Sequence, residues 1–372
     1  MSLNKKKQVK FVTNKVNASF FPILKERVDN YFVENNISKH FNLTMVVKTV
    51  VLFATYLMPF VLFLLLQPPF WASCLLWFVM GLGMAGVGMS VMHDANHGAY
   101  SANKTANRWI GYSLNLFGGV CFNWQLQHNV LHHTYTNITH LDDDIADKAV
   151  LKFSPHTEVK SFHRLQYVYA LFFYGILTLY WALGKDFVQY VRYTKNGVNS
   201  NTKKQNAVLL FKIIAIKTIY LAAFFLLPAA LGLPFYQVLV GFLLMHFTAG
   251  IILTVIFQLA HTVEETSHPL PTEHGTIENS WAIHQLNTTV NFSRHNKFLS
   301  WYLGGLNYQV EHHLFPRICH VHYPNIAGIV KSTAEEFGVP YLENHTFGDA
   351  LRSHFTTLKR FGRLPDLNEG IG

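Results

Sequence analysis

Residues 125–137 read QLQHNVLHHTYTN and hold three histidines at a spacing that suits a helix. His128 and His132 are four residues apart, which places their side chains on one helix face about 5–6 Å apart at Cβ, with His133 one step round. Two further stretches repeat the idea, HDANH at residues 93–97 and QVEHH at residues 309–313. Three such clusters in a chain with 21 histidines predict a metal site built from imidazoles.

The composition indicates a membrane protein, because half of the 372 residues are hydrophobic and only 14% are charged. The formal net charge of +9 then favours lipid headgroups as the acidic partner, and we expect no nucleic acid. Cys74, Cys121 and Cys319 are scattered and form no Cys-x-x-Cys pair. Neither a disulfide framework nor a zinc ribbon is therefore expected.

Four apolar runs are long enough to cross roughly 30 Å of hydrocarbon at about 1.5 Å per residue: residues 45–66, 70–92, 209–231 and 235–260. Short uncharged turns at residues 67–69 and 232–234 join them into two hairpins. The second run contains GLGMAG at residues 81–86, which matches a dinucleotide-binding pattern. No strand precedes it, so close helix packing in the membrane is the better interpretation.

Three other apolar segments are too short or too mixed to span. Residues 18–32 predict an amphipathic helix on the membrane surface, with an ordinary packing helix as the alternative. Residues 109–122 are expected to be interfacial or re-entrant. Residues 167–183 are borderline, and we place them at the interface because an even number of crossings must separate His133 from His261 if both lie on one side.

Charge predicts the sidedness. Basic residues lie in the N-terminal segment, which starts with Lys5, Lys6 and Lys7, in residues 140–205 and in the C-terminal third, so that face is predicted to be cytoplasmic. No cleaved targeting segment is expected. We predict three parts: a cytosolic N-terminus (residues 1–44), a membrane domain with the first two histidine boxes in its cytosolic segment 93–205 (residues 45–260), and a cytosolic C-terminal cap with the third box (residues 261–372).

Ligation by histidine without cysteine leaves zinc, copper, iron and nickel open as the metal. Seven box histidines fit two metals better than one, since a single zinc takes three or four ligands. His261 is an eighth candidate, because the last apolar run ends on it. The soluble di-iron bundles use repeated Glu-x-x-His motifs. Only Glu265 and His268 have that spacing here, so that architecture is not expected.

The order of two membrane hairpins and the boxes HDANH, HNVLHH and QVEHH resembles the integral-membrane fatty acid desaturases, from residue 45 onward, and the glutamine that opens the third box resembles their front-end branch. The resemblance implies an all-α integral membrane protein with four transmembrane helices, interfacial helices and a cytosolic cap. It also implies a di-iron centre (Fe²⁺/Fe³⁺) that uses dioxygen and two electrons to introduce a cis double bond into a long acyl chain.

The family's iron ligands carry over to the matching positions, which are His93, His97, His128, His132, His133, His312 and His313, with His261 as the extra ligand after the last membrane helix. Gln309 stands where many relatives have a histidine. That departure leaves one coordination position as an amide oxygen, a water or an open site.

The resemblance also implies partners and a location. The substrate is a membrane lipid or an acyl-CoA, and the enzyme lies in a bacterial inner membrane or the endoplasmic reticulum, with its active site on the cytoplasmic face. About 40 residues precede the membrane part, so no fused cytochrome b5 domain is expected. Electrons must then come from a separate ferredoxin, or from cytochrome b5 with its reductase. Lys195, Lys203 and Lys204 lie in a loop that could dock such an acidic donor or meet lipid phosphates.

Several polar residues near the boxes are candidates to orient imidazoles through their free N–H groups, or else are ordinary solvated or capping residues: Asp94, Asn96, Glu311 and the run Asp142, Asp143, Asp144. His246, inside an apolar run, is predicted to be a hydrogen-bonded core or tunnel residue. The remaining histidines near the boxes are expected to serve other roles than metal binding: His140, His284, His320 and His322.

Two rival functions remain open at this stage. A hydroxylase acting on an acyl chain, an alkane or a sphingoid base would use the same di-iron scaffold. A metal transporter would need ionisable residues inside the spans. In the second hairpin His246 and Lys217 are its chief candidates, which makes a transporter the weaker alternative.

Overall fold

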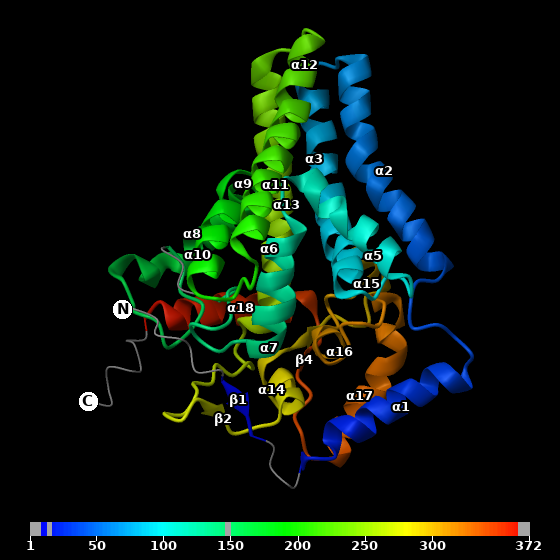
Figure 1. Cartoon of the computed structure of the whole chain (residues 1–372), viewed down its shortest axis with the longest axis vertical. Helices are drawn as coiled ribbons and strands as arrows, with labels where there is room; N and C mark the ends of the chain where they lie inside the picture. Colours follow the sequence, from blue (N-terminus) through cyan, green and yellow to red (C-terminus); the bar gives the residue numbers. More distant parts are fainter. Residues whose placement is uncertain (1–8, 13–16, 146–149, 364–372) are drawn as a thin grey trace. The chain divides into compact units, whose positions relative to one another are not determined.

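The computed structural model describes residues 9–12, 17–145 and 150–363, and these residues are mostly helical (Figure 1). The run Lys5, Lys6 and Lys7 lies outside them. The chain divides into two compact units. Unit 1 comprises Met1–Phe41, Gln127–Ala170 and Ile256–Gly372, and unit 2 comprises Asn42–Leu126 and Leu171–Val255.

Four helical stretches are long and apolar enough to cross a membrane: Leu43–Leu66, Phe70–His97, Lys203–Ala230 and Phe235–His261. They correspond to the four predicted runs. The second comprises α3 (Phe70–Gly86), a π-helical segment (Val87–Met92) and α4 (His93–His97). The others are α2 (Leu43–Leu66), α11 with α12 (Lys203–Leu221 and Leu227–Ala230) and α13 (Phe235–His261). The chain is therefore a membrane protein.

Local signals fix where these helices begin and how closely they pack. The Asn42 side chain accepts a hydrogen bond from Met45 N and caps α2. A Cβ atom on Gly83 would lie 2.5 Å from Tyr56 N, so α3 packs directly against the backbone of α2. The glycines of residues 81–86 therefore serve helix packing, as predicted, because only a residue without a side chain allows this approach.

The four stretches differ in how much of each is covered by protein. Only 22% of the most apolar window is buried in Leu43–Leu66 and 28% in Lys203–Ala230, against 67% in Phe70–His97 and 56% in Phe235–His261. Large apolar side chains such as Leu65 and Phe211 are 74% and 70% exposed. An apolar surface of this kind needs lipid around it.

Shorter elements complete unit 2. Residues 109–122 form no single helix but fall into α5 (Lys104–Gly111), a 3₁₀ helix (Tyr112–Phe117) and α6 (Cys121–Gln125). Residues 167–183 lie in α8 (Gln166–Gly175) and α9 (Leu177–Tyr180), which precede α10 (Asp186–Lys195). This segment bends by 50° at its break, so it becomes a fifth span only if the bent pair is counted as one.

Unit 1 packs short helices around one apolar core. Its helices include α1 (Phe20–Glu34), α7 (His133–Tyr135), α14 (Trp281–Thr288), α15 (Lys297–Tyr302), α16 (Gln309–Leu314), α17 (Tyr323–Glu336) and α18 (Phe347–Phe361). Two parallel strand pairs join distant segments: β1 (Lys10–Phe11) with β2 (Thr276–Ile277), and β3 (Asn291–Phe292) with β4 (Glu343–Asn344).

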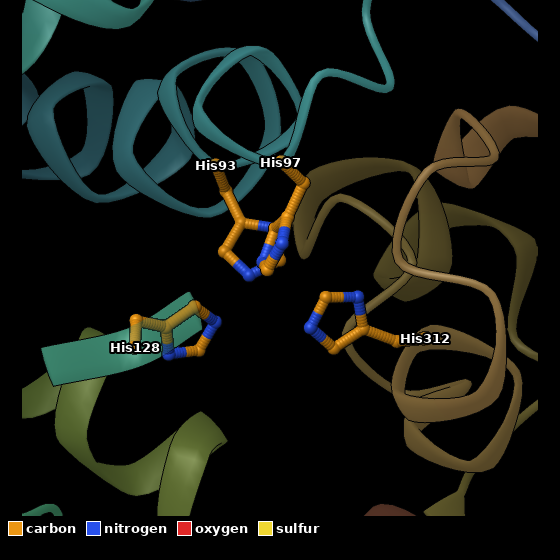
Figure 2. A group of neighbouring side chains, drawn as sticks. All are labelled: His93, His97, His128 and His312. Carbon is orange, nitrogen blue, oxygen red and sulfur yellow. The ribbon is translucent and has the colours of Figure 1, made fainter. Parts of the chain in front are cut away.

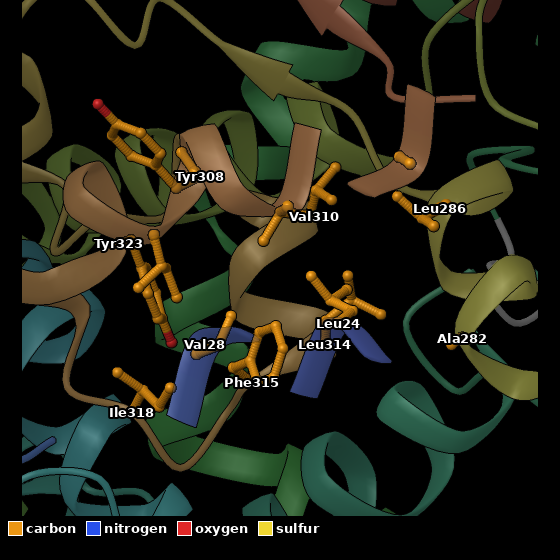
Figure 3. Packing of buried hydrophobic residues seen from close by; sticks show 14 of the residues in the cluster. Leu24, Val28, Ala282, Leu286, Tyr308, Val310, Leu314, Phe315, Ile318 and Tyr323 are labelled. Atoms are coloured by element: carbon orange, nitrogen blue, oxygen red, sulfur yellow. The ribbon is translucent and has the colours of Figure 1, made fainter. Parts of the chain in front are cut away.

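The structure corrects the membrane-surface interpretation of residues 18–32. The apolar face of α1 is fully buried at Phe20, Leu24 and Val28, and it packs against residues of α14, α16 and α17 (Figure 3). Each large apolar side chain buried in this way contributes about 1.5–3 kcal/mol to folding. Helical periodicity predicts an apolar face but does not say whether that face meets a protein core or lipid. Here it meets a protein core, so α1 is a packing helix.

Candidate metal centre

The second histidine box lies on a π-helical segment of unit 1, Leu126–His132, which continues into α7. A π-helix closes hydrogen bonds from residue i to i+5, so residues five apart come onto nearly the same face. His128 Nε2 and His133 Nε2 are accordingly 3.3 Å apart. An α-helix would have turned His133 away. The π geometry therefore brings the whole box to one side.

His132 is held by carboxylates that follow it in the chain. Its Nδ1 lies 3.1 Å from Asp142 Oδ2 and 3.5 Å from Asp144 Oδ2. Burial alone would lower the pKa of His132, but the charge of Asp142 and its hydrogen bond raise it. Of the run Asp142, Asp143 and Asp144, predicted as candidates to orient imidazoles, Asp142 and Asp144 contact His132. His132 Nε2 is buried and has no hydrogen-bond partner in the described part of the chain.

The third box forms α16, and both of its histidines are buried. His313 Nδ1 lies 2.7 Å from Gln285 Oε1, and His312 Nδ1 lies 3.3 Å from Tyr323 Oη. Burial and the neighbouring histidines lower the pKa of His313, so its ring is neutral near pH 7. His313 Nε2 is another buried nitrogen without a hydrogen-bond partner among residues 9–12, 17–145 and 150–363.

His261 is the last residue of α13, where the sequence placed it. Its Nδ1 lies 3.2 Å from the carbonyl oxygen of Thr288, and its buried Nε2 makes no hydrogen bond to any described residue. Gln309, at the start of α16, is buried with its side chain beside the His261 ring. The position that departs from the usual histidine therefore lies next to a candidate ligand.

These side chains converge within unit 1. The candidate ligand atoms of His132, His261 and His313 all lie within 4.8 Å of one another, as do those of His133, His312 and His313. The rings of His128 and His312 are nearly parallel, at 16°, with centroids 6.0 Å apart (Figure 2). Buried imidazoles that converge in this way are suitable ligands for a transition metal. The residues present therefore fit a metal.

The first box belongs to unit 2. His93 and His97 project from the same side of α4 with ring centroids 4.7 Å apart, as the i, i+4 spacing predicts (Figure 2). Both rings meet the edge of Trp124, at 5.8 Å between centroids. The two rings are therefore close enough to bind one metal ion together.

Some of the residues predicted to orient imidazoles make other contacts instead. Glu311 accepts hydrogen bonds from Asn291 Nδ2 and Tyr341 Oη, at 2.8 and 2.7 Å, so its prediction as an imidazole partner is wrong. Burial raises the pKa of Glu311 despite these bonds. Asp94 Oδ1 is 3.9 Å from His93 Nδ1, too far for a hydrogen bond. Asn96 links α4 to the Gly111 carbonyl and to Gln125.

Of the other histidines near the boxes, His140, His284 and His322 lie outside the groups of possible metal ligands formed by the described residues, whereas His320 belongs to a further such group with Cys319. His284 Nε2 is 2.8 Å from the Thr136 carbonyl, and burial lowers its pKa to about 4. His322 Nε2 is 2.9 Å from the His40 carbonyl, and His140 is exposed. His246 is a hydrogen-bonded core residue between Tyr220 and Thr178, as predicted.

Sequence reasoning missed the partners on the outer side of the rings. Gln285 contacts His313 from 28 residues before it, Thr288 contacts His261 from 27 residues after it, and Tyr323 contacts His312 from 11 residues after it. These three partners belong to no box. One signal was available: Trp281, His284, Gln285 and Thr288 share one face of a helix. Which segments that face meets is a tertiary property.

Comparison with known proteins agrees with this geometry. Residues 69–345 match the family model described as fatty acid desaturase. The chain belongs to the fatty acid desaturase family. It is 38% identical over 349 residues to the sn-1 linoleoyl-lipid 6-desaturase of Synechocystis sp. (strain ATCC 27184 / PCC 6803 / Kazusa), covering 92% of this chain and 96% of that protein.

Two other relatives point the same way. The sn-1 linoleoyl-lipid 6-desaturase of Arthrospira platensis is 34% identical over 343 residues, 92% of each chain. The acyl-lipid (8-3)-desaturase of Physcomitrium patens is 34% identical over 358 residues, 93% of this chain and 72% of that protein. The chain is thus an oxidoreductase, a front-end-type fatty acid desaturase of a metalloenzyme class, and the predicted activity is confirmed.

The two residues that a metal transporter would use, Lys217 and His246, both contact other protein groups. Lys217 Nζ forms an ion pair with Asp186 Oδ2 at 2.9 Å and donates to the carbonyl oxygens of Gly118 and Trp181. His246 is engaged through both ring nitrogens. Both residues therefore have structural partners that account for their presence in the apolar helices.

Proposed function

We propose that this desaturase holds two iron ions and inserts a cis double bond into an acyl chain of a membrane lipid. The proposed ligands are His93, His97, His128, His132, His133, His261, His312 and His313, with Gln309 at the variable position. The observation that carries the proposal is the group His132, His261 and His313, whose inward ring nitrogens are buried and make no hydrogen bond to the described residues. Buried polar atoms of this kind are costly unless a further partner binds them.

The chemistry of the substrate determines what the metal must do and what the protein side chains must do. An unactivated methylene has no acidic proton, so side-chain acid–base catalysis cannot remove its hydrogens. Iron, when bound, supplies the oxidising power for that removal. Two hydrogens leave adjacent carbons as two electrons and two protons; together with two electrons from the donor and two protons from water they reduce one dioxygen to two waters. The protein contributes positioning: Asp142 orients His132, and the apolar surroundings exclude water.

The substrate class comes from the relatives. Because two of them are named linoleoyl-lipid 6-desaturases and cover nearly the whole chain, we propose a lipid-bound linoleoyl chain as substrate and carbon 6 as the position of the new bond. The test is the fatty-acid profile, by gas chromatography and mass spectrometry, of a host that makes linoleoyl lipids and expresses this chain with a ferredoxin or cytochrome b5 donor. We expect a linoleoyl product with one further double bond at carbon 6.

Other products would change the proposal. A new double bond at another carbon would retain desaturation and overturn the position. A hydroxylated product would overturn the reaction on the same metal site. Labelling the lipid headgroup or the CoA pool separately identifies the acyl carrier.

The topology is part of the proposal. Two membrane hairpins with the three boxes on the cytoplasmic face require an even number of crossings between His133 and His261, so α8 and α9 must stay at the interface. Single cysteines placed at the exposed residues His140 and Glu264 should react with a membrane-impermeant reagent from the same side. Reaction from opposite sides would contradict this topology.

We further propose that an acidic electron donor docks on the exposed lysines Lys195, Lys203 and Lys204 of unit 2. Reversal of these charges to glutamate should slow the donor-dependent rate and remove its salt dependence. An unchanged rate, with weaker binding to anionic vesicles, would assign the lysines to lipid phosphates instead.

A further inference from the structure

Helix α14 presents one polar face to three histidine-bearing segments of unit 1. Trp281, His284, Gln285 and Thr288 follow the i, i+3, i+4, i+7 spacing of one helix face. Trp281 Nε1 donates to the His133 carbonyl at 2.9 Å, and His284 Nε2 lies 2.8 Å from the Thr136 carbonyl. The Thr288 carbonyl faces His261. A helix that carries no proposed ligand therefore contacts the segments that carry several.

Gln285 lies at the centre of this face and makes the most informative contacts. Its Nε2 donates to the His133 carbonyl at 3.3 Å, and its Oε1 lies 2.7 Å from His313 Nδ1. A carbonyl oxygen can only accept, so the amide group that faces His133 must be the NH₂. The amide oxygen is then directed to His313. Thr136 Oγ1, 2.8 Å from Gln285 Oε1, suits either orientation because a hydroxyl both donates and accepts.

The amide orientation determines the tautomer of His313. Since Gln285 Oε1 can only accept, the hydrogen of the neutral ring must reside on Nδ1, and the lone pair is left on Nε2. His313 Nε2 is the ring nitrogen that makes no hydrogen bond to the described residues, and a ligand atom of His313 lies within 4.8 Å of those of His132 and His261. A reversed amide would place two oxygens against each other at His133 and would leave the hydrogen on Nε2, where it blocks a metal.

We propose that Gln285 is a positioning residue that fixes the metal-binding tautomer of His313 and, through α14, braces the second and third histidine boxes. The inference rests on the proposed metal centre but concerns a residue that belongs to no histidine box. The carbonyl of Thr288 acts in the same sense on His261, since it too can only accept. Outer partners of this kind orient metal ligands, and their loss weakens metal binding about 10–100-fold.

The test compares two buried glutamines in the full-length protein. Gln285→Met keeps the side-chain length and removes the three side-chain hydrogen bonds, to the His133 carbonyl, His313 Nδ1 and Thr136 Oγ1. Gln166→Met is the matched control, because Gln166 is fully buried in unit 1 and bonds only the backbone of Lys152 and Leu358. Metal-free protein is titrated with Co²⁺, and binding is followed by absorption. We expect Gln285→Met to raise the dissociation constant about 10–100-fold and Gln166→Met to leave it at the parent value.

A third variant distinguishes the two proposed roles of Gln285, which are to fix the tautomer of His313 and to brace the second and third histidine boxes. Gln285→Glu retains an acceptor for His313 Nδ1 but opposes an oxygen to the His133 carbonyl. It should bind Co²⁺ more tightly than Gln285→Met while lowering the melting temperature of the metal-free protein. Cobalt binding by Gln285→Met equal to the parent, equal weakening in Gln285→Met and Gln166→Met, or no gain in Gln285→Glu would each overturn the inference.

Failure of the proposed metal centre has a different signature. In that case the parent itself would bind no cobalt and would form no unsaturated product. In a failure of the Gln285 inference alone, the parent and Gln285→Met would both bind and both desaturate.

Discussion

A buried histidine of unit 2 and three buried histidines of unit 1 differ in how they use their ring nitrogens. In unit 2, His246 Nε2 lies 2.8 Å from Tyr220 Oη and its Nδ1 lies 3.2 Å from Thr178 Oγ1. In unit 1, His132, His261 and His313 each use Nδ1 for a protein contact, while Nε2 makes no hydrogen bond to the described residues. Both ring nitrogens of His246 therefore have a hydrogen-bond partner within the protein. The unit 1 histidines leave buried nitrogens without a partner among the described residues, and the proposed metal would supply one.

One buried nitrogen without a partner is not sufficient. His163 accepts a hydrogen bond from Lys160 N through Nδ1, and its Nε2 is likewise without a hydrogen-bond partner among the residues described. Burial and nearby lysines lower the pKa of His163, so it remains neutral. What distinguishes the unit 1 histidines is convergence, with three candidate ligand atoms within 4.8 Å. Convergence, not burial, separates a metal site from a packed histidine.

The largest expected effect is from His132→Ala, which removes one converging nitrogen. We expect no detectable desaturation, because the metal loses a ligand that other side chains cannot replace. His163→Ala is the control, since it removes an isolated nitrogen, and it should retain the activity. The product is measured as the new unsaturated fatty acid in expressing cells. Equal activity in the two variants would remove the distinction between convergent and isolated nitrogens.

The next largest effect is expected at Lys217, a buried charged residue that forms an ion pair with Asp186. Lys217→Met leaves Asp186 buried without its cation, which costs about 3–5 kcal/mol of unfolding free energy. Lys212→Met, at an exposed lysine of the same helix, should cost little. Unfolding in detergent, followed by circular dichroism, measures both. If Lys217→Met destabilised the protein no more than Lys212→Met, the ion pair would have no structural role.

A smaller effect is expected from Asp142→Asn. Asp142 Oδ2 accepts from both His132 and the Asn137 backbone, and an asparagine loses the charge that favours these bonds. Metal affinity should fall about 10–100-fold, with the fold retained. Asp349→Asn, at an exposed carboxylate that caps α18, serves as the control and should bind metal like the parent. Equal affinities in both variants would show that Asp142 does not tune His132.

The smallest effect is at the surface. Asp29 accepts from Lys39 and Lys25 at 2.6 and 3.0 Å. Burial opposes its ionisation, but these bonds outweigh it and lower the pKa of Asp29 below its usual 3.8. The stabilisation is therefore present above that pH and is lost as the pH falls through the lowered value. Asp29→Asn should cost about 0.2–1 kcal/mol at pH 7, less in high salt, and nothing at the acid end. A cost that persists in acid would contradict the ion-pair origin.

The sequence predicted much of the fold. The four apolar runs match the four candidate spans to within six residues at each end, because hydrophobic length is a local property. It also predicted the His93 and His97 pair and the position of His261 at the end of α13. Helix periodicity located α1, but it could not say that this face meets protein and not lipid.

The site was less predictable in its supporting residues. The spacing HNVLHH predicted an α-helix with His133 one step round from His128 and His132. The structure has a π-helical segment there, which brings His133 Nε2 to 3.3 Å from His128 Nε2. Glu311 adjoins two candidate ligands in sequence yet bonds Asn291 and Tyr341, while Gln285 in another helix supports His313. Sequence proximity identifies ligands that share a helix, but their outer partners depend on which helices meet.

The most direct test of the central claim is the iron content of three purified proteins: the parent, His313→Ala and His246→Phe. Elemental analysis of parent protein loaded anaerobically with Fe²⁺ should give about two irons per chain, since the eight proposed histidine ligands are enough for two sites. His313→Ala should hold less, and His246→Phe, which loses only hydrogen bonds to Tyr220 and Thr178, should match the parent. A parent without iron, or the same iron content in all three proteins, would contradict the account.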